Sequence, residues 1–213
     1  MNDDALIDAL LGGADTEAEY DQDGRRQAHS STTTPTLRRE SNRRRLQRIG
    51  REQSCAEQIA TLPAEGEEIV MLMDGQWHGW DLVGAVLHLA SPATIQHLGV
   101  ATLGFNRTQA QHLNNLLDTG HIEAVTMIAS EMFRDKNIPE YTALHEALTS
   151  RGQRLATTRN HAKLITLELT DGRKLVAHGS LNLRRCNSIE QVVLANAPDL
   201  HDFFRQYIEE AAA

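Results

Sequence analysis

The sequence predicts an α/β fold for the larger part of this 213-residue chain, and three observations support it. From residue 67 onward, short apolar runs alternate with amphipathic segments, as in folds that pack helices against a sheet. Turn and cap residues separate these runs. Near the C-terminus, two β-rich runs flank a Thr-Asp-Gly-Arg turn, which predicts a β-hairpin.

Composition divides the chain into three parts. Residues 1–36 are predicted to be a disordered acidic tail, because residues 1–35 hold eight acidic residues, two arginines and few apolar side chains. A short acidic, leucine-rich segment in this tail could dock a protein partner. Residues 37–66 are predicted to be a basic helix and a linker, and residues 67–213 the folded domain.

The basic helix is expected over residues 37–60, and seven arginines occur within residues 36–52. This arginine cluster could contact nucleic acid or an acidic partner. It could equally be a solvated face that pairs with the acidic tail. Both interpretations stay open at this point.

The folded domain is expected to begin with three strand and helix pairs. Asn106 is a plausible helix cap, Gly120 ends that helix, Pro139 stands in the first turn of the next helix, and Gly152 ends it. Loops are expected over 75–80 and 130–137, and residues 153–159 lead into the hairpin. The expected strands cover 68–74, 94–105, 122–130, 161–169, 174–180 and 188–197, and the expected helices cover 81–90, 107–119, 139–152 and 198–211.

The hairpin carries the residues with the clearest chemistry. In a strand, alternate side chains share a face, so His161 and Lys163 are expected to point the same way, as are Ser180 and Asn182. Histidine can attack phosphorus or move protons, lysine neutralises phosphate oxygens, and serine and asparagine hydrogen-bond them. This set of groups suits a phosphodiester.

Charge supports an anionic substrate for the hairpin region. The chain has a formal net charge of −8, yet residues 151–185 hold eight basic and two acidic residues, a net +6. Local positive charge of this kind attracts polyanions. A solvated end of the sheet would give the same charge pattern, so charge alone does not decide.

These residues resemble the HxK…GSxN signature of the phospholipase D superfamily, with the match at His161, Lys163, Gly179, Ser180 and Asn182. The resemblance covers about residues 67–213 and outside the motif is architectural. It implies a phospholipase D-like mixed β-sheet flanked by helices on both faces. It also implies a reaction that needs no metal and no cofactor.

Two acidic positions bear on this resemblance. Glu190 stands where the family often has an acid that orients the histidine. Glu168 stands where the family usually has aspartate, five residues after the lysine. Because that acid is not the nucleophile, the difference bears more on activity than on fold.

The resemblance also implies a homodimer. Enzymes of this family use two HxK motifs, and this sequence has one, so two copies would meet at a two-fold axis. One His161 would attack phosphorus, giving a phosphohistidine, and the other would protonate the leaving oxygen. Lys163 would stabilise the charge, Ser180 and Asn182 would orient the phosphate, and Glu190 would hold the histidine ring.

We therefore expect a nuclease-type phosphodiesterase that acts on nucleic acid. The alternative is a phospholipase D-like module that binds DNA or serves as a scaffold without cleavage, which the Glu168 difference favours. Further candidates for substrate binding follow other expected strands or the motif itself, at positions where α/β ligand sites lie. They are Trp77, His78, Ser130, Arg134 and Arg184.

Several other classes are not indicated. No phosphate-binding glycine motif is present, so a nucleotide cofactor is not expected. Cys55 and Cys186 have no partner at metal-ligand spacing, which argues against zinc and fits a reduced cytoplasmic chain. No signal peptide and no apolar run of about 20 residues is found, so no membrane association is expected.

Overall fold

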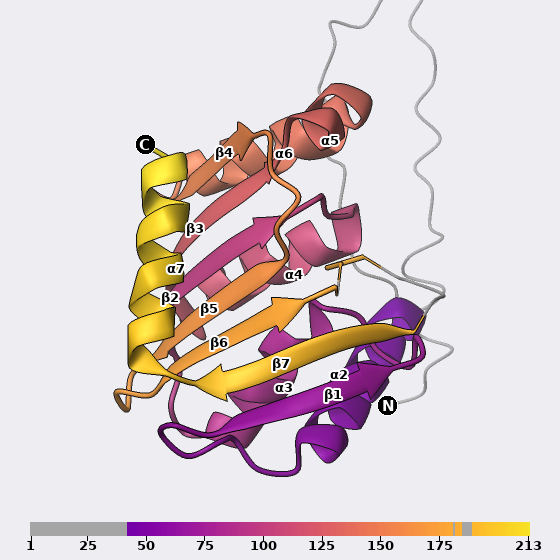
Figure 1. Ribbon diagram of the computed structural model, residues 1–213. Helices are drawn as coiled ribbons and strands as arrows, with labels where there is room; N and C mark the ends of the chain where they lie inside the picture. Colours follow the sequence, from indigo (N-terminus) through magenta and orange to yellow (C-terminus); the bar gives the residue numbers. More distant parts are fainter. Residues whose placement is uncertain (1–41, 181, 185–188) are drawn as a thin grey trace, which may run out of the picture. The chain divides into compact units, whose positions relative to one another are not determined.

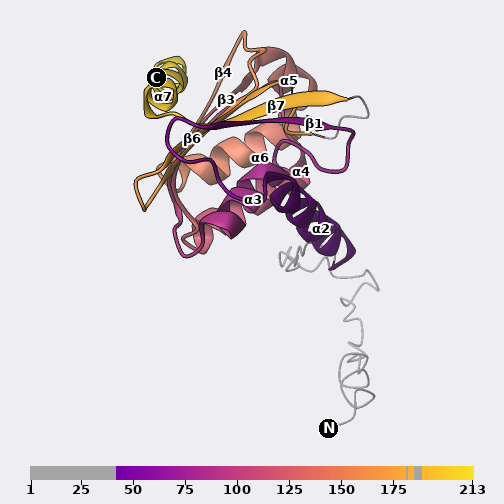
Figure 2. The same ribbon diagram turned by 60° about the horizontal axis from the view of Figure 1, so that its bottom comes forward.

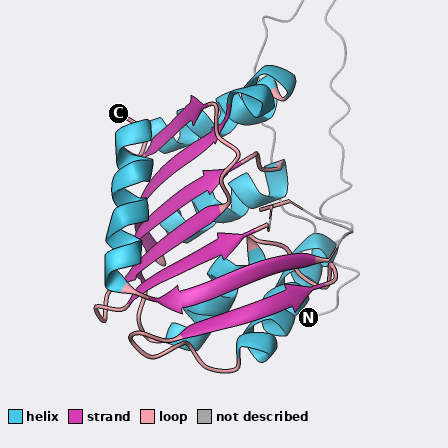
Figure 3. Ribbon diagram, in the orientation of Figure 1, coloured by secondary structure: helices cyan, strands magenta, loops and turns pink. Residues whose placement is uncertain are grey.

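A computed structural model of the chain describes residues 42–180, 182–184 and 189–213. The predicted acidic tail, residues 1–36, lies outside the described residues, so its disorder stays a prediction. The described residues form helices and a seven-stranded sheet, which confirms the predicted α/β class (Figures 1 and 3). The helices are α2 (Asn42–Ile59), α3 (Asp81–Ala90), α4 (Arg107–Asp118), α5 (Glu131–Lys136), α6 (Ile138–Thr149) and α7 (Pro198–Ala211). The strands are β1 (Glu68–Met73), β2 (Ile95–Thr102), β3 (Ile122–Ser130), β4 (Arg154–Thr158), β5 (Leu164–Leu169), β6 (Lys174–Gly179) and β7 (Glu190–Asn196).

The sheet is mixed, with the strand order β1-β7-β6-β5-β2-β3-β4. Strands β2, β3 and β4 pair in parallel, and the other neighbours pair antiparallel. The carboxyl ends of β1, β2, β3, β4 and β6 therefore lie at the same end of the sheet as the amino ends of β5 and β7. We call this the carboxyl end of the sheet, and it is on the right in Figure 1.

Helices cover both faces of the sheet, as the sequence led us to expect. Helix α7 packs on one face over β2, β3, β5 and β6. Figure 2 shows α3, α4 and α6 on the opposite face, with α2 packed against α3. Within the described ranges, no helix is both long and apolar enough to cross a bilayer.

The burial of each strand follows its place in the sheet. Central strands β2 and β3 are buried along most of their length, as expected for strands covered on both faces. Edge strand β1 alternates instead. Met71 and Met73 face the core, whereas Val70 and Leu72 point outward and are exposed.

Helix α2 contributes to the same core as the sheet. Cys55, Ala56 and Ile59 are buried on its inner face, and the described residues from 42 onward belong to one compact unit. The connection from α2 to β1 is tied down as well, because the buried Asn196 side chain donates a hydrogen bond to the Pro63 carbonyl oxygen at 3.1 Å. The described part of the basic helix is thus a structural element of the folded unit.

Several local predictions are confirmed. The β5–β6 hairpin turns at Asp171 and at Gly172, whose φ of 90° favours glycine. Asn106 caps α4, and a capping box forms because Gln109 reaches back to the Asn106 backbone N–H. Pro139 lies in the first turn of α6.

Three expectations need correction. Residues 131–136 form the short helix α5 where a loop was expected, and residues 154–158 form strand β4 where only a connection was expected. Strand β5 begins at Leu164, so His161 and Lys163 precede it. The alternation of side chains along a strand therefore does not position these two residues.

Candidate active site

His161 and Lys163 lie at the carboxyl end of the sheet, in the segment between β4 and β5. The His161 ring is exposed, and Lys163 is half-buried. Lys163 Nζ donates to the His161 carbonyl oxygen at 3.2 Å and lies 3.5 Å from His161 Nδ1. A cation thus lies beside an accessible imidazole, and such a pair can bind and attack a phosphoryl group.

Gly179 and Ser180 form the other half of the motif, at the end of β6. A Cβ on Gly179 would lie 2.2 Å from the Gln191 carbonyl oxygen, so β7 approaches too closely for any other residue. Ser180 N donates to the Gln191 carbonyl oxygen at 3.0 Å, and Ser180 Oγ accepts from Gln191 N at 3.0 Å. The serine is therefore held against β7 by its backbone and its hydroxyl.

Asn182 is held by its backbone, and its side-chain oxygen is buried. Gly79 N donates to its carbonyl oxygen at 3.2 Å. The adjacent Leu183 carbonyl oxygen accepts from the buried Gln109 side chain. Asn182 Oδ1 is buried and has no hydrogen-bond partner among the described residues. A buried carboxamide oxygen of this kind is available to a ligand or a water molecule.

The two halves of the motif line one shallow hollow at the carboxyl end of the sheet. Lys163 borders it from the start of β5, Gly179 from the end of β6, and Leu183 from the segment that follows. Residues from β2 and β7 complete it. The complete lining is Ala101, Thr102, Lys163, Leu164, Ile165, Ala177, His178, Gly179, Leu183 and Val192.

The two acidic positions lie apart from this hollow. Glu190 is buried at the start of β7, opposite Met73, and no contact with the His161 ring is found in the described part of the chain. Glu168 pairs with Arg205 of α7 and lies opposite His97 and Lys174, near the other end of β5. Glu168 is therefore part of the packing between α7 and the sheet.

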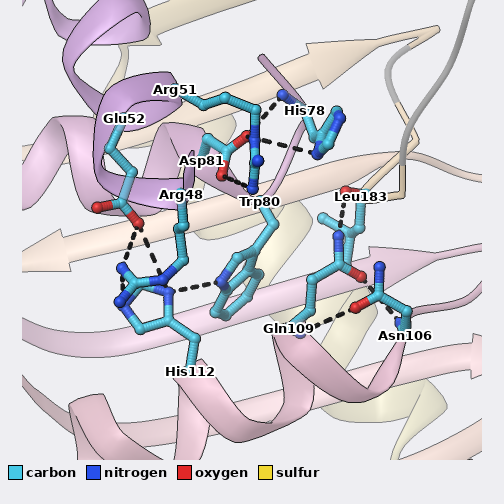
Figure 4. Close-up of polar contacts among 10 residues, drawn as sticks. All are labelled: Arg48, Arg51, Glu52, His78, Trp80, Asp81, Asn106, Gln109, His112 and Leu183. Carbon is cyan, nitrogen blue, oxygen red and sulfur yellow. Dashed lines mark hydrogen bonds and ion pairs between the residues drawn. The ribbon is translucent and has the colours of Figure 1, made fainter. Parts of the chain in front are cut away.

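Trp77 and His78, which follow β1, form hydrogen bonds within the domain. Trp77 is buried, and its Nε1 donates to Gln58 Oε1 of α2 at 2.9 Å, so its ring offers no exposed face for stacking. His78 N donates to Asp81 Oδ2 at 2.8 Å, and His78 lines a cavity of about 180 Å³ beside Arg51. Figure 4 shows His78 above the start of α3.

The candidates that follow β3 and the motif lie farther along the same end of the sheet. Ser130 is buried, and its hydroxyl caps α5 by accepting from Met132 N at 3.2 Å. Arg134 donates to Thr157 Oγ1 at 2.9 Å and pairs with Asp135. Arg184 is exposed, and its guanidinium lies 5.6 Å from the centre of the Phe133 ring.

The arginines of α2 that face the domain are paired within it (Figure 4). Arg48 pairs with Glu52 at 2.7 Å, and Arg51 pairs with Asp81 at 2.7 Å. Arg43 and Arg45 of the same helix are exposed. That the arginine cluster contacts nucleic acid or an acidic partner stays a prediction.

His112 completes the network between α2, α3 and α4. Trp80 Nε1 lies 3.0 Å from its Nδ1, and Arg48 Nη1 lies 2.9 Å from its Nε2. Burial, assisted by the Arg48 charge, lowers the pKa of His112 to about 3. The histidine is thus neutral and structural.

No group of three or more potential metal ligands occurs among the described residues. Sequence reasoning missed Asn160, Gln191 and Gln109, which hold the two motif halves in place. Asn160 bonds the backbone of Thr102 and of Ala162, Gln191 bonds Ser180, and Gln109 bonds the Leu183 carbonyl oxygen. Most of these contacts join residues far apart in sequence, so a sequence pattern gives no signal for them.

Comparison with known proteins gives matches at the level of fold. No protein-family model matches the sequence, and no curated protein matches it. A polyphosphate kinase from Porphyromonas gingivalis matches with a TM-score of 0.53 and 12% identity, over 74% of this chain and 29% of that chain. This match shows a shared fold, and the present chain spans less than a third of the kinase.

Two further solved structures match with lower scores. Nuc, a phospholipase D family member from Salmonella typhimurium, has a TM-score of 0.47 and 18% identity, over 68% of this chain and 94% of that chain. TrmBL2, an archaeal chromatin protein, has a TM-score of 0.44 and 11% identity, over 79% of this chain and 62% of that chain.

Proposed function

We propose that this protein is a phospholipase D-like phosphodiesterase that cleaves nucleic acid through a phosphohistidine, in a site shared by two copies of the chain. The observation that carries the proposal is the meeting of the two motif halves. Lys163 before β5 and Gly179 at the end of β6 line one hollow, although they are 16 positions apart in sequence. His161, Ser180 and Asn182 flank these two residues.

The chemistry follows from the groups at this site. His161 of one copy attacks phosphorus, a P–N bond forms, and the bond to the leaving oxygen breaks while His161 of the second copy donates a proton to that oxygen. The second histidine then takes a proton from water, the hydroxide attacks phosphorus, and the P–N bond breaks. Lys163 stabilises the negative charge in both steps. By its resemblance, the reaction needs no metal.

An exposed apolar surface supports the second copy. Val70 and Leu72 of edge strand β1 are 59% and 68% exposed, and Phe203 of α7 is 65% exposed. Monomers seldom keep several large apolar side chains in water on one face.

The strand register places them together. Val70 is opposite Val193, and Val193 is opposite His178, so the three side chains share a face of the sheet. The His178 ring lies 6.2 Å from the Phe204 ring of α7, which identifies this face as the one that α7 covers only in part. Leu72 is opposite Gln191, the residue that holds Ser180. The apolar face therefore extends to the site.

Positive charge at this end of the sheet supports a polyanionic substrate. Arg159 is exposed next to the motif, and Arg184 is exposed just after it. Lys163 lines the hollow, and the two arginines add positive charge near it in the chain. Nucleic acid presents a phosphate at every nucleotide, so such cations would hold the strand on both sides of the scissile bond.

One observation favours a second candidate, a module that binds DNA without cleaving it. In the described part of the chain, no carboxylate contacts the His161 ring, and an imidazole without an orienting acid is a weaker base and nucleophile. Binding without cleavage would follow if no such acid reaches the ring in the dimer.

The test is digestion of labelled single-stranded and double-stranded DNA in the presence of EDTA. We expect cleavage by the unaltered chain and its loss in His161→Ala, with a covalent protein–phosphate adduct trapped by acid quench. His88→Ala, which removes an exposed histidine from α3, is the matched control and should cleave normally. Cleavage that survives His161→Ala would overturn the proposal. Salt-sensitive binding with no cleavage would instead establish the second candidate.

A further inference from the structure

Asn160 joins the end of β2 to the segment that carries His161 and Lys163. Asn160 as a whole is 6% exposed. Nδ2 donates to the Thr102 carbonyl oxygen at 3.0 Å, and Oδ1 accepts from Ala162 N at 2.9 Å. A single carboxamide therefore ties the chain to β2 and also closes the turn around His161.

Both attachment points are fixed in their turn. Thr102 is buried, and its hydroxyl hydrogen-bonds the Gly104 backbone at 3.1 and 3.2 Å. A Cβ on Gly104 would lie 2.3 Å from the Phe133 ring, so this turn is packed without free space. Ala162 packs against the small apolar cluster of Ala101, Ile128 and Ile208 under α7. The carboxamide thus spans two rigid parts of the fold.

His161 lies between these attachments and outside the β5 ladder, which begins at Leu164. We propose that Asn160 is a positioning residue, which sets the orientation of His161 and, through the bond from Lys163 Nζ to the His161 carbonyl oxygen, that of Lys163. Its catalytic consequence rests on the proposed function. A nucleophile must be held within a fraction of an ångström of its line of attack, so loss of this tie would slow the chemical step.

The geometry requires a donor and an acceptor on one short planar group. Alanine at position 160 removes both bonds. Aspartate keeps the acceptor for Ala162 N, but its charged form repels the Thr102 carbonyl oxygen. A protonated aspartate can donate to that oxygen, so an Asn160→Asp chain should recover its geometry as pH falls.

Asn196 offers a matched control at the opposite end of the sheet. It is also buried, and its Nδ2 donates to a backbone carbonyl distant in sequence, that of Pro63, at 3.1 Å. Asn196→Ala therefore removes a comparable buried hydrogen bond without touching the site. Its loss of stability should resemble that of Asn160→Ala, because each variant leaves one buried backbone carbonyl oxygen without its donor.

The experiment measures kcat and KM on a single-stranded DNA oligonucleotide for Asn160→Ala, Asn160→Asp and Asn196→Ala, together with amide hydrogen exchange at Ala162. We expect kcat to fall about 100-fold in Asn160→Ala, with KM changed less than about 3-fold. Exchange at Ala162 should accelerate about 10-fold in that variant, and should stay slow in Asn196→Ala. Relative to the unaltered chain, Asn160→Asp should gain activity between pH 7 and pH 5.

The two proposals fail in different ways. If the unaltered chain cleaves nothing, the proposed function fails, and exchange at Ala162 still decides whether Asn160 holds the segment. If Asn160→Ala and Asn196→Ala lose activity equally, or if Ala162 exchanges equally in both, the positioning role is wrong. Should Asn160→Ala not fold, the pH dependence of Asn160→Asp decides, since a purely structural role predicts the same pH profile as the unaltered chain.

Discussion

Arg51 Nε donates to Asp81 Oδ2 at 2.7 Å and ties α2 to the first residue of α3 (Figure 4). The same oxygen accepts from His78 N at 2.8 Å, so one carboxylate joins the helix, the loop after β1 and the start of α3. The Asp81 side chain is 2% exposed and that of Arg51 is 26% exposed. This relationship makes the described part of the basic helix integral to the domain.

Asp81→Ala should lower the free energy of unfolding by about 3 kcal/mol, because it leaves the Arg51 guanidinium partly buried without its counter-ion and His78 N without its acceptor. Urea unfolding measures the change. Asp118→Ala is the control, since Asp118 pairs with Arg151 at the surface, and such exposed pairs contribute below about 1 kcal/mol. Equal losses in the two variants would contradict the integral role of α2.

Gly179→Ala should destabilise the fold and abolish activity, whereas Gly50→Ala should not. A Cβ at position 179 would meet the Gln191 carbonyl oxygen at 2.2 Å, which must separate β6 from β7 and release Ser180. We expect a loss above about 2 kcal/mol. Gly50 in α2 has open space around its Cβ, so alanine there should raise the stability by about 0.5–1 kcal/mol. Thermal and urea unfolding compare the two.

The fold was predictable where hydrophobic periodicity is long and regular. The central strands, α4 with its Asn106 cap, and the Asp171–Gly172 hairpin all follow from local patterns that tertiary contacts reinforce. Strand β4 escaped prediction because it is a short, half-buried edge strand rich in threonine. Helix α5 escaped because six residues are too few to show a helical period.

The residues of the candidate site could be predicted from the sequence, but the hydrogen bonds that hold them in place could not. The motif residues could be read from the sequence, and their catalytic roles stay predictions. The place of His161 outside β5 could not be read, because it depends on the bond from Asn160 to Thr102, 58 residues away. In the same way, Glu168 stood at a motif position in the sequence, but in the structure its carboxylate accepts a hydrogen bond from Arg205 of α7. Sequence patterns carry no signal for such distant pairs.

The free energy of unfolding should decrease as the pH falls below about 6.5, and the buried His112 should contribute to this decrease. Its pKa is lowered to about 3 in the folded chain by burial and by Arg48, against about 6.5 for an unfolded histidine. Between these values the unfolded chain binds the extra proton, so the stability that neutral His112 supports is full above pH 6.5 and is lost as pH falls toward 3. The slope is up to about 1.4 kcal/mol per pH unit.

His112→Gln should therefore flatten the pH dependence. The variant loses the bonds of the imidazole and should be less stable at pH 8, but its stability should decline less than that of the unaltered chain between pH 6.5 and pH 4. Urea unfolding at a series of pH values measures both curves. Above pH 7 the two curves should run parallel, which provides an internal control. Parallel curves below pH 6 as well would show that His112 is protonated as readily in the fold as in the unfolded chain.

Leu72→Lys should separate the proposed dimer and stop cleavage without unfolding the chain. Leu72 is 68% exposed on the outer face of β1, so a lysine there meets water in the single copy but would meet an apolar partner in the dimer. Sedimentation at micromolar concentration should show dimers for the unaltered chain and monomers for Leu72→Lys. Leu46→Lys is the matched control, because Leu46 is 67% exposed on α2, away from this face, and should remain dimeric and active. Because one chain supplies one His161, an active monomer of Leu72→Lys would refute the shared site, while inactive monomers that regain cleavage at high concentration would support it.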